Sequence, residues 1–435
     1  MFAIERDQVA LFMEMRLGKS LVAERWLRAK LPKQGRALIV SPLSAIPDWI
    51  ETLRGEGHDP TWIRGNEEDR QLLASNRRRT FFLINPALIT PYGSKHVRIP
   101  KLLMRESWDA VVLDESTMIR NPRAMITRVV QSAFRSVPLK AVLTGLPNPA
   151  SALDYFEQLC FLQGEFMGCS NYWQWRHRYF RVDWTGFGWF PKPGTIALIK
   201  TALQENCFQL SRAQAGVGPN KIFKARFLSA TPDQKRLHKQ ALQDFQAGNR
   251  ETKSRLTVEL WLQQIAGGFH PEGGAVISDA KLREIEYLLS TELKGQRVVI
   301  WFAFNAELHY VQEALRAKKW RTASITGETD PDSRASIRKL LDLGEIQVLL
   351  AQLRCVRFGV NFSSADTGIY YSNVYDLEIR RQSEDRQVHM KRKDPILLID
   401  LVTEGSADQA VREALRDKKI TASIFGTRIW KELLK

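Results

Sequence analysis

A Gly-Lys-Ser segment near the start of the chain has the residue types of a phosphate-binding loop. Residues 9–13 form an apolar run, and Gly18, Lys19 and Ser20 open the helix-period stretch that follows it. Backbone N–H groups at a helix start bind phosphate oxygens, and glycine lets the backbone approach closely. Lys19 would reach the β- and γ-phosphates, and the Ser20 hydroxyl would ligate Mg²⁺. The residues that we expect around a nucleotide triphosphate here are Arg16, Leu17, Gly18, Lys19 and Ser20.

Two adjacent carboxylates, Asp114 and Glu115, end a second apolar run at 110–113. Ligands of parallel sheets bind outside the carboxyl ends of the strands, so this pair can face a bound nucleotide. Asp114 would hold Mg²⁺ through water, and Glu115 would orient and deprotonate the attacking water. A solvated turn is the alternative for such a pair, and the phosphate loop upstream favours the catalytic interpretation. The sequence thus predicts an ATP hydrolase with ATP and Mg²⁺ as its cofactors.

Short apolar runs alternate with helix-period stretches along the chain, which is typical of parallel α/β sheets. The first series of expected strands is 9–13, 37–40, 81–84, 110–113 and 141–143. The second series is 297–303, 321–325, 347–351, 367–371 and 396–402, with helices expected over 305–318, 332–343 and 407–418. The fold class that we expect is α/β, with two parallel-sheet domains of similar size in tandem.

The middle of the chain differs from both series because it is rich in aromatic and basic residues. Between residues 173 and 226 there are nine Lys or Arg and two Asp or Glu, a local charge of +7. The aromatic block 172–192 could stack on a DNA junction or a single strand, or it could form a small satellite core. The segments that we expect are domain one over 1–164, an aromatic-basic insertion with a helical linker over 165–270, and domain two over 271–435.

The formal net charge is +16, and a basic surface of this size most often meets a polyanion such as nucleic acid. A protein that is basic only for solubility is the alternative. The four cysteines contain no Cys-x-x-Cys pair, which favours idle buried thiols over a zinc ribbon or a disulfide framework.

Several segments resemble one known family when they are taken in chain order. Residues 110–123 closely resemble the Asp-Glu-[Ser/Gly]-His-x-x-Lys-Asn box of Swi/Snf-type ATPases, a branch of helicase superfamily two. Residues 143–148 resemble that family's Leu-Thr-Gly-Thr-Pro segment, and residues 38–43 resemble its first DNA-facing strand and loop. Residues 361–366 resemble its Asn-Leu-x-x-Ala-Asp segment, and residues 382–386 resemble its Gln-Ala-Glu-Asp-Arg box. The similarity covers nearly the whole chain.

The resemblance implies two RecA-like domains, ATP bound in the cleft between them, and DNA-stimulated hydrolysis that drives translocation along duplex DNA. It implies that Arg386 is an arginine finger for the γ-phosphate, and that Thr144 and Gly145 couple the ATP site to the DNA. Further positions that it places at the nucleotide are Gly359, Asn361, Gln382 and His389. The positions that it places at nucleic acid are Ser41, Pro42, Thr144, Gly145 and Gly327.

Departures from the family pattern leave other functions open. Met13 and Arg16 stand where the phosphate loop of the family has glycine, Thr117 replaces a histidine, and His389 replaces an arginine. One alternative is therefore a DNA-binding module whose degenerate site hydrolyses ATP weakly or not at all. An RNA-directed motor is a further hypothesis, which the Asp-Glu-Ser box disfavours against an Asp-Glu-Ala-Asp box.

The sequence also suggests a cellular context. The start of the chain has no secretory apolar region, and the run 298–304 is too short to span a bilayer. These features predict a cytoplasmic protein with no membrane association. From the economy of two motor domains and one modest insertion we expect a bacterial or phage protein that acts in replication, recombination or repair. We also expect a monomer that binds double-stranded or branched DNA.

Overall fold

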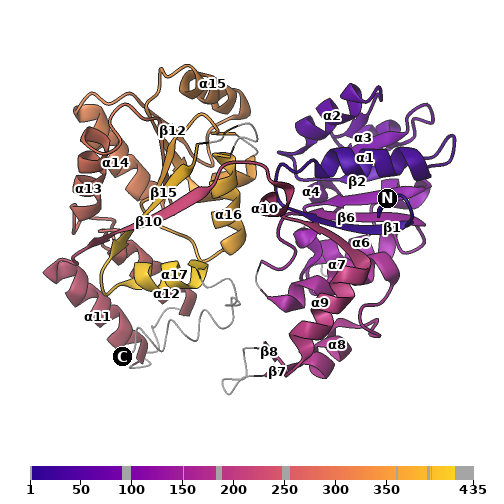
Figure 1. The fold of residues 1–435 in the computed structure, drawn as a ribbon, viewed down its shortest axis with the longest axis horizontal. Helices are drawn as coiled ribbons and strands as arrows, with labels where there is room; N and C mark the ends of the chain where they lie inside the picture. Colours follow the sequence, from indigo (N-terminus) through magenta and orange to yellow (C-terminus); the bar gives the residue numbers. More distant parts are fainter. Residues whose placement is uncertain are drawn as a thin grey trace. The chain divides into compact units, whose positions relative to one another are not determined.

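The computed structural model describes residues 2–90, 99–149, 151–182, 189–246, 255–358, 361–388, 392 and 394–416. The chain divides into two compact units, Met1–Gly216 and Val217–Lys435, and each is built around one sheet (Figure 1). Neighbouring strands of both sheets pair in parallel. The expected α/β class with two parallel-sheet domains in tandem is therefore confirmed.

The sheet of the first unit has the strand order β3-β4-β2-β5-β6-β1-β9. Its strands are β1 (Gln8–Met13), β2 (Ala37–Val40), β3 (Thr61–Ile63), β4 (Phe81–Ile84), β5 (Ala110–Asp114), β6 (Leu139–Thr144) and β9 (Cys207–Leu210). The central strands are buried on both faces, which explains why they appear in the sequence as continuous apolar runs rather than as alternating patterns.

Helices cover both faces of this sheet. The helical segments are α1 (Lys19–Lys30), α2 (Ile46–Gly55), α3 (Glu67–Ala74), α4 (Pro86–Ile89), α5 (Lys101–Arg105), η1 (Ser116–Ile119), α6 (Met125–Ala133), η2 (Ala152–Asp154), α7 (Tyr155–Gln163), α8 (Tyr172–Tyr179), α9 (Thr195–Asn206) and α10 (Arg212–Ala215). Leu11 of β1 packs with Trp26 of α1 and Trp49 of α2. Its neighbour Phe12 points to the other face and packs with Phe156 of α7. A short antiparallel hairpin, β7 (Phe180–Val182) with β8 (Trp189–Pro191), follows α8.

The sheet of the second unit has the order β10-β15-β14-β11-β13-β12. Its strands are β10 (Lys221–Leu228), β11 (Val298–Phe302), β12 (Thr322–Ile325), β13 (Val348–Gln352), β14 (Thr367–Tyr370) and β15 (Ile396–Thr403). Its helical segments are α11 (Pro232–Gln246), α12 (Arg255–Ala266), α13 (Ala280–Ser290), α14 (Asn305–Ala317), α15 (Pro331–Asp342), η3 (Leu353–Phe358), α16 (Leu377–Arg386) and α17 (Ala407–Arg416). Ile300 packs under α13 and α14, whereas Trp301 packs under α15 and α16.

The structure divides the middle of the chain differently from the three expected segments. The division between the units falls after Gly216, so the segment 165–270 is not a unit of its own. Its first part joins unit one, where β9 pairs with β1, and the rest joins unit two, where β10 pairs with β15. A short strand shows no preference in sequence for one sheet over another, because pairing depends on which sheet edge is open.

Two smaller expectations concern the thiols and the membrane. The four cysteines are free and buried, as expected. Among the residues that the structure describes, no helix combines the length and the apolar character that crossing a bilayer requires.

Candidate functional site

The carboxyl ends of β1, β6 and β5 bring the predicted nucleotide motifs to one edge of the first sheet. Phe12 of β1 lies opposite Thr144 of β6, and Leu143 of β6 lies opposite Asp114 of β5. The chain leaves β1 into the Gly-Lys-Ser loop, leaves β5 into Glu115, and leaves β6 into Gly145. Segments that are about a hundred residues apart in sequence therefore meet at the place where parallel sheets bind their ligands.

The phosphate loop spans the turn between β1 and α1. Gly18 has a φ of 78°, in the left-handed region, and α1 begins at the next residue. The Lys19 ammonium donates to the carbonyl oxygen of Met13 at 3.0 Å and lies 3.5 Å from that of Glu14, so it lies inside the loop. The first N–H groups of an α-helix have no acceptor within the helix, so the start of α1 adds donors to the loop that holds the ammonium.

The structure accounts for the two residues that depart from the family pattern in this loop. Met13 is the last residue of β1 and is 3% exposed, because it belongs to the core under α1. Arg16 has a φ of 69°, which is a conformation that favours glycine and that costs other residues about 1–2 kcal/mol. The loop thus keeps a left-handed turn at the position where the family pattern has glycine.

Asp114 is held in place by donors from three parts of the unit. Its Oδ2 accepts hydrogen bonds from Ser41 Oγ at 2.9 Å and Trp49 Nε1 at 2.8 Å, and its Oδ1 accepts one from the Glu115 N–H at 3.1 Å. The carboxyl is 6% exposed. A buried carboxylate needs such donors, because its desolvation would otherwise be costly. Asp114 is therefore fixed in direction at the edge of the site.

Glu115 connects the acidic pair to β6. Its backbone is left-handed, with φ 51° and ψ 57°, and its Oε2 accepts a hydrogen bond from Thr144 Oγ1 at 3.3 Å. Thr144 in turn accepts from the Leu146 N–H at 3.2 Å. A Cβ on Gly145 would lie 3.4 Å from both the N and the Cγ of Met15, so glycine keeps this segment close to the phosphate loop. The end of β6 thus contacts both halves of the site.

Two residues expected at nucleic acid lie elsewhere. Ser41 is fully buried and Thr144 is 1% exposed, and their hydroxyls bond to Asp114 and Glu115. Neither hydroxyl is open to a phosphate backbone, in contrast to the expectation, because the buried carboxylates use them as donors. Pro42 and Gly145 are half-buried, and Gly327 is exposed at the end of β12 in the second unit. Sequence reasoning also missed the bond from Trp49 to Asp114, which depends on how α2 packs.

In the second unit the segment around Asn361 lies beside the end of α16. The Phe362 N–H donates to the Arg386 carbonyl at 2.8 Å, and Asn361 accepts from the Ser363 N–H at 3.0 Å. Gln382 Nε2 donates to Glu378 Oε1 at 3.2 Å. Asn361, Gln382 and Arg386 therefore belong to one region of this unit. Gly359 and His389 lie outside the described residues.

The rest of the Gln-Ser-Glu-Asp-Arg box takes part in a buried ionic cluster that the sequence analysis missed. Arg380 of α16 pairs with Asp400 of β15. Its Nε also lies 2.9 Å from Oε1 of Glu384. Lys221 of β10 binds Glu384 at 3.0 Å and Asp385 at 2.7 Å. Asp400 could have indicated this cluster from the sequence, because a single acid inside an apolar strand needs a buried cation as its partner.

The residues present fit a magnesium ion that arrives with a nucleotide. Among the described residues, no group of three or more His, Cys, Asp or Glu could hold a metal ion by itself. Mg²⁺ keeps several waters and is usually bound by one or two carboxylates together with substrate phosphates. The fixed Asp114 carboxylate and the Ser20 hydroxyl beside the loop meet that need.

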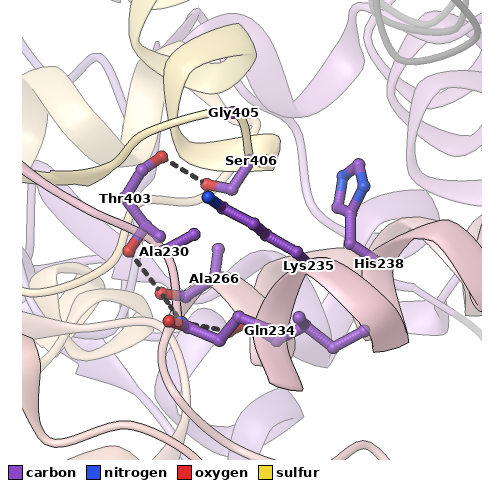
Figure 2. Close-up of a pocket in the computed structure, with 9 residues that line it drawn as sticks. Ala230, Gln234, Lys235, His238, Ala266, Thr403, Gly405 and Ser406 are labelled. Atoms are coloured by element: carbon purple, nitrogen blue, oxygen red, sulfur yellow. Dashed lines mark hydrogen bonds between the residues drawn. The ribbon is translucent and has the colours of Figure 1, made fainter. Parts of the chain in front are cut away.

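A small pocket in the second unit has a different character. It has a volume of about 120 Å³ and lies between α11, the end of α12 and the turn after β15 (Figure 2). Gln234 donates to the carbonyl oxygens of Ile265 and Ala266, and Thr403 donates to that of Ala266. The side chains of Gln234 and Thr403 are therefore occupied by hydrogen bonds within the pocket wall. These bonds connect α11 and β15 to the end of α12.

Comparison with known proteins agrees with the geometry of the first sheet. Residues 5–264, more than half of the chain, match the SNF2-related domain. The chain belongs to the SNF2-related family. Residues 280–391 match the helicase conserved C-terminal domain. The resemblance to Swi/Snf-type ATPases of helicase superfamily two is thereby confirmed.

Two curated relatives and one solved structure illustrate what this SNF2-related chain is similar to. The SWI/SNF-related matrix-associated actin-dependent regulator of chromatin subfamily A-like protein 1 of Drosophila melanogaster is 23% identical over 78% of this chain and 44% of its own length. The ISWI chromatin-remodeling complex ATPase ISW1 of Saccharomyces cerevisiae is 22% identical over 93% of this chain and 37% of its own. The Sulfolobus solfataricus SWI2/SNF2 ATPase core in complex with dsDNA is 18% identical, with coverages of 100% and 92% and a TM-score of 0.44. The chain spans less than half of the length of these two curated relatives.

Proposed function

We propose that the protein is an ATP-driven translocase on double-stranded DNA. The observation that carries the proposal is the meeting of the phosphate loop and the Asp114–Glu115 pair at one sheet edge, in a chain of the SNF2-related family. This arrangement has the parts that phosphoryl transfer to water requires, namely phosphate donors, a metal-holding carboxylate and a second acid for the water. A role in replication, recombination or repair belongs to the same proposal.

Each residue of the first unit has a role that follows from its place. Lys19 and the N–H groups at the start of α1 bind the β- and γ-phosphates, and Ser20 and Asp114 would hold Mg²⁺, which would supply positive charge to the phosphates. Glu115 accepts the proton of the attacking water. Thr144, through its bond to Glu115, passes the state of the nucleotide to the segment after β6.

The second unit contributes charge and DNA contacts in this proposal. Arg386, at the end of α16, supplies a guanidinium to the γ-phosphate, with Asn361 and Gln382 in the same region. Pro42 and Gly145 of the first unit and Gly327 of the second approach the DNA backbone. The backbone N–H groups of the two glycines bind phosphates without reading the base sequence, whereas Pro42 has no N–H and can contribute only shape.

Phosphate release with and without blunt duplex DNA tests the proposal. We expect duplex DNA to stimulate turnover, and ATP to drive displacement of a third strand from a triplex as the protein moves along the duplex. Lys19→Ala should lower turnover by about 10²-fold or more, because the phosphates lose their main cation. Glu115→Gln should keep ATP binding and lose hydrolysis. Absence of any DNA stimulation would remove the translocase from consideration.

Matched controls separate the site from general effects of substitution. Lys30→Ala removes a lysine at the other end of α1, where it pairs with Asp7 at the surface. Glu51→Gln removes an exposed acid of α2. Both controls should hydrolyse ATP at the wild-type rate. If Lys19→Ala and Glu115→Gln did so as well, the site would be wrong.

A DNA-binding module with weak or no hydrolysis is the second candidate. The observation that favours it is Arg16, a large cation at a left-handed position of the phosphate loop. This candidate predicts DNA binding that ATP does not change. A DNA-dependent turnover of even about one per minute, far below the usual range for enzymes, would rule out a module that does not hydrolyse ATP.

A further inference from the structure

The first unit carries a surface series of alternating arginines and tryptophans. The Arg123 guanidinium lies 4.8 Å from the centre of the Trp173 ring, and that of Arg176 lies 4.5 Å from the same ring. Arg176 also lies 3.9 Å from the centre of the Trp189 ring, against which the His177 ring packs edge-on at 5.0 Å. We call these five residues, Arg123, Trp173, Arg176, His177 and Trp189, the arginine–tryptophan ladder.

The ladder is distinct from the apolar core beneath it. Trp175 of the same helix is fully buried and packs on Phe156, which shows that α8 has an inner aromatic face. The ladder belongs to the outer face, where Trp173, Arg176 and Trp189 are half-buried and the end groups Arg123 and His177 are exposed. The aromatic block thus contains both a satellite core and an open aromatic surface.

The exposed charges of α8 and of the residues next to it in the described part of the chain are positive. Arg178, Arg181 and Lys192 are exposed beside it, and the sequence has no acid at 171–182 or 189–192. The Nε of Arg176 is buried without a hydrogen-bond partner, and the guanidinium lies against the rings of Trp173 and Trp189. These rings therefore help to hold the guanidinium in place. The exposed cations beside it present a positive surface to a polyanion.

The geometry points to unpaired DNA bases as the ligand: we infer that the ladder is a stacking site for a single-stranded segment of the DNA substrate. Flat guanidinium and indole groups stack with bases, and the exposed ends at Arg123 and His177 let a base extend the series. Bases inside a duplex are stacked on one another, so their faces are not available. The neighbouring cations would follow the phosphates of the same strand.

The ladder is also joined to the predicted ATP site through the chain. Arg123 follows Glu115 by eight residues, and the turn η1 lies between them. Ser116, the first residue of that turn, donates to the buried Gln158 of α7 at 2.7 Å, which anchors it to the unit. A base stacked at Arg123 would therefore contact the segment that continues from the Asp-Glu pair. The inference of a single-strand site rests on the proposed function. It adds branched DNA with an unpaired arm to the substrates of the proposed motor.

Equilibrium binding of the full chain without ATP tests the inference. The probes are a fluorescent oligothymidine of about 16 nucleotides and a blunt duplex. Trp189→Ala should weaken binding of the oligothymidine by about 5- to 150-fold and change binding of the duplex by less than about twofold. Arg176→Lys keeps the charge and loses the flat group. It should therefore also weaken binding of the oligothymidine and leave binding of the duplex unchanged. Trp189→Phe keeps a ring face and should restore most of the affinity.

Trp62→Ala is the matched control, because Trp62 is a half-buried indole on β3 that pairs with Arg64 at 5.0 Å outside the ladder. It should bind both probes as the wild type does. Equal losses on both probes with Trp189→Ala, wild-type oligothymidine binding by Arg176→Lys, or tighter binding of oligouridine than of oligothymidine would overturn the inference. Duplex-stimulated ATP hydrolysis is measured separately, so a failure of the motor proposal can be told apart from a failure of the ladder.

Discussion

Asp114 shows how a buried carboxylate can be kept at a reactive edge. Its oxygens accept hydrogen bonds from Ser41, from Trp49 and from the adjacent backbone N–H, all within 3.1 Å. Two of these donors come from the residue after β2 and from α2, so packing of other elements sets the direction of the carboxylate. Hydrogen bonds to charged groups contribute more to stability than those between neutral groups.

Trp49→Phe should therefore destabilise the first unit more than a comparable change elsewhere. We expect a loss of about 1.5–3 kcal/mol for the hydrogen bond to a charged acceptor, together with slower ATP hydrolysis. Trp26→Phe is the control, since Trp26 is also 1% exposed and donates to the neutral carbonyl of Arg6 at 2.9 Å, where about 0.5–1.5 kcal/mol is expected. Urea unfolding measures both variants. Equal losses would mean that Asp114 does not depend on its indole donor.

Glu307 of α14 is a second buried acid, but it is held differently. Burial raises the pKa of Glu307 from 4.5 to about 7, against the attraction of Lys281. Ser372 donates to its Oε2, while its Oε1 is buried without a partner. A Cβ on Gly267 would meet Oε1, so any other residue at position 267 would force the Glu307 side chain to move. The protonated form fits this place better than the ion.

This shift has a definite sign for stability. The folded protein binds more protons at Glu307 than the unfolded chain does between about pH 4.5 and about pH 7, so the free energy of unfolding falls as the pH rises through that window. The fall should be roughly 3 kcal/mol. Glu307→Gln should remove it, and Glu313→Gln, an exposed acid on the same helix, should not. Denaturant unfolding across this pH window measures the effect. If the free energy of unfolding fell by the same amount in Glu307→Gln, the pH dependence would not come from Glu307.

At the scale of elements, α16 is tied to two strands by buried charges. Arg380 joins it to Asp400 of β15, and Lys221 of the edge strand β10 joins Glu384 and Asp385. Arg380 also lies 3.4 Å from the centre of the Tyr370 ring of β14. The helix that ends at Arg386 is thus positioned by charges rather than by apolar contacts alone.

Arg380→Met should destabilise the second unit by about 3–5 kcal/mol, because it leaves the buried Asp400 with the more distant cation of Arg412, whose Nε lies 4.0 Å from Oδ2. Arg338→Met removes an exposed arginine that pairs with Asp342 on α15 and should cost less than about 1 kcal/mol. Calorimetry of the full chain measures both. A loss for Arg380→Met as small as that for Arg338→Met would mean that the cluster does not position α16.

At the scale of the whole molecule, the charge of +16 is the property that supports the proposed binding to a DNA backbone. Each phosphate that the protein neutralises releases condensed counterions, so affinity falls with salt in proportion to the number of contacts. This term does not depend on base sequence, which suits a motor that moves along DNA.

Affinity for blunt duplex DNA should fall by about 10³-fold between about 50 mM and about 200 mM salt if roughly six phosphates are contacted. Fluorescence anisotropy over a salt series measures the slope. The Trp189→Ala variant should keep the wild-type slope for duplex, because it removes no charge. An affinity that does not vary with salt would contradict binding to the DNA backbone.

Much of the fold was predictable because apolar runs mark buried parallel strands directly. The expected strands and the helices at 305–318 and 332–343 were found within a few residues of their predicted bounds. The strands β3, β9 and β10 were missed, since edge strands are short or exposed and lack the continuous apolar signal. Consequently the boundary at Gly216 was also missed.

The residue types at the nucleotide site were predictable, whereas the partners of those residues were not. Lys19 at the loop and the acids after β5 follow from motif and strand end. The burial of Ser41 and Thr144 was not foreseen, because a hydroxyl in a family motif can face either the ligand or its supporting carboxylate. Cellular context, oligomeric state and the role of Arg386 stay predictions.

By itself the sequence determined the fold class, the family and the chemical groups of the site, because these depend on local order and on residue type. Only the tertiary structure decided which donors hold Asp114 and Glu115, which sheet each edge strand joins, and which tryptophans of the middle segment face outward. These features depend on contacts between segments that are distant in the chain, and such contacts leave no local pattern.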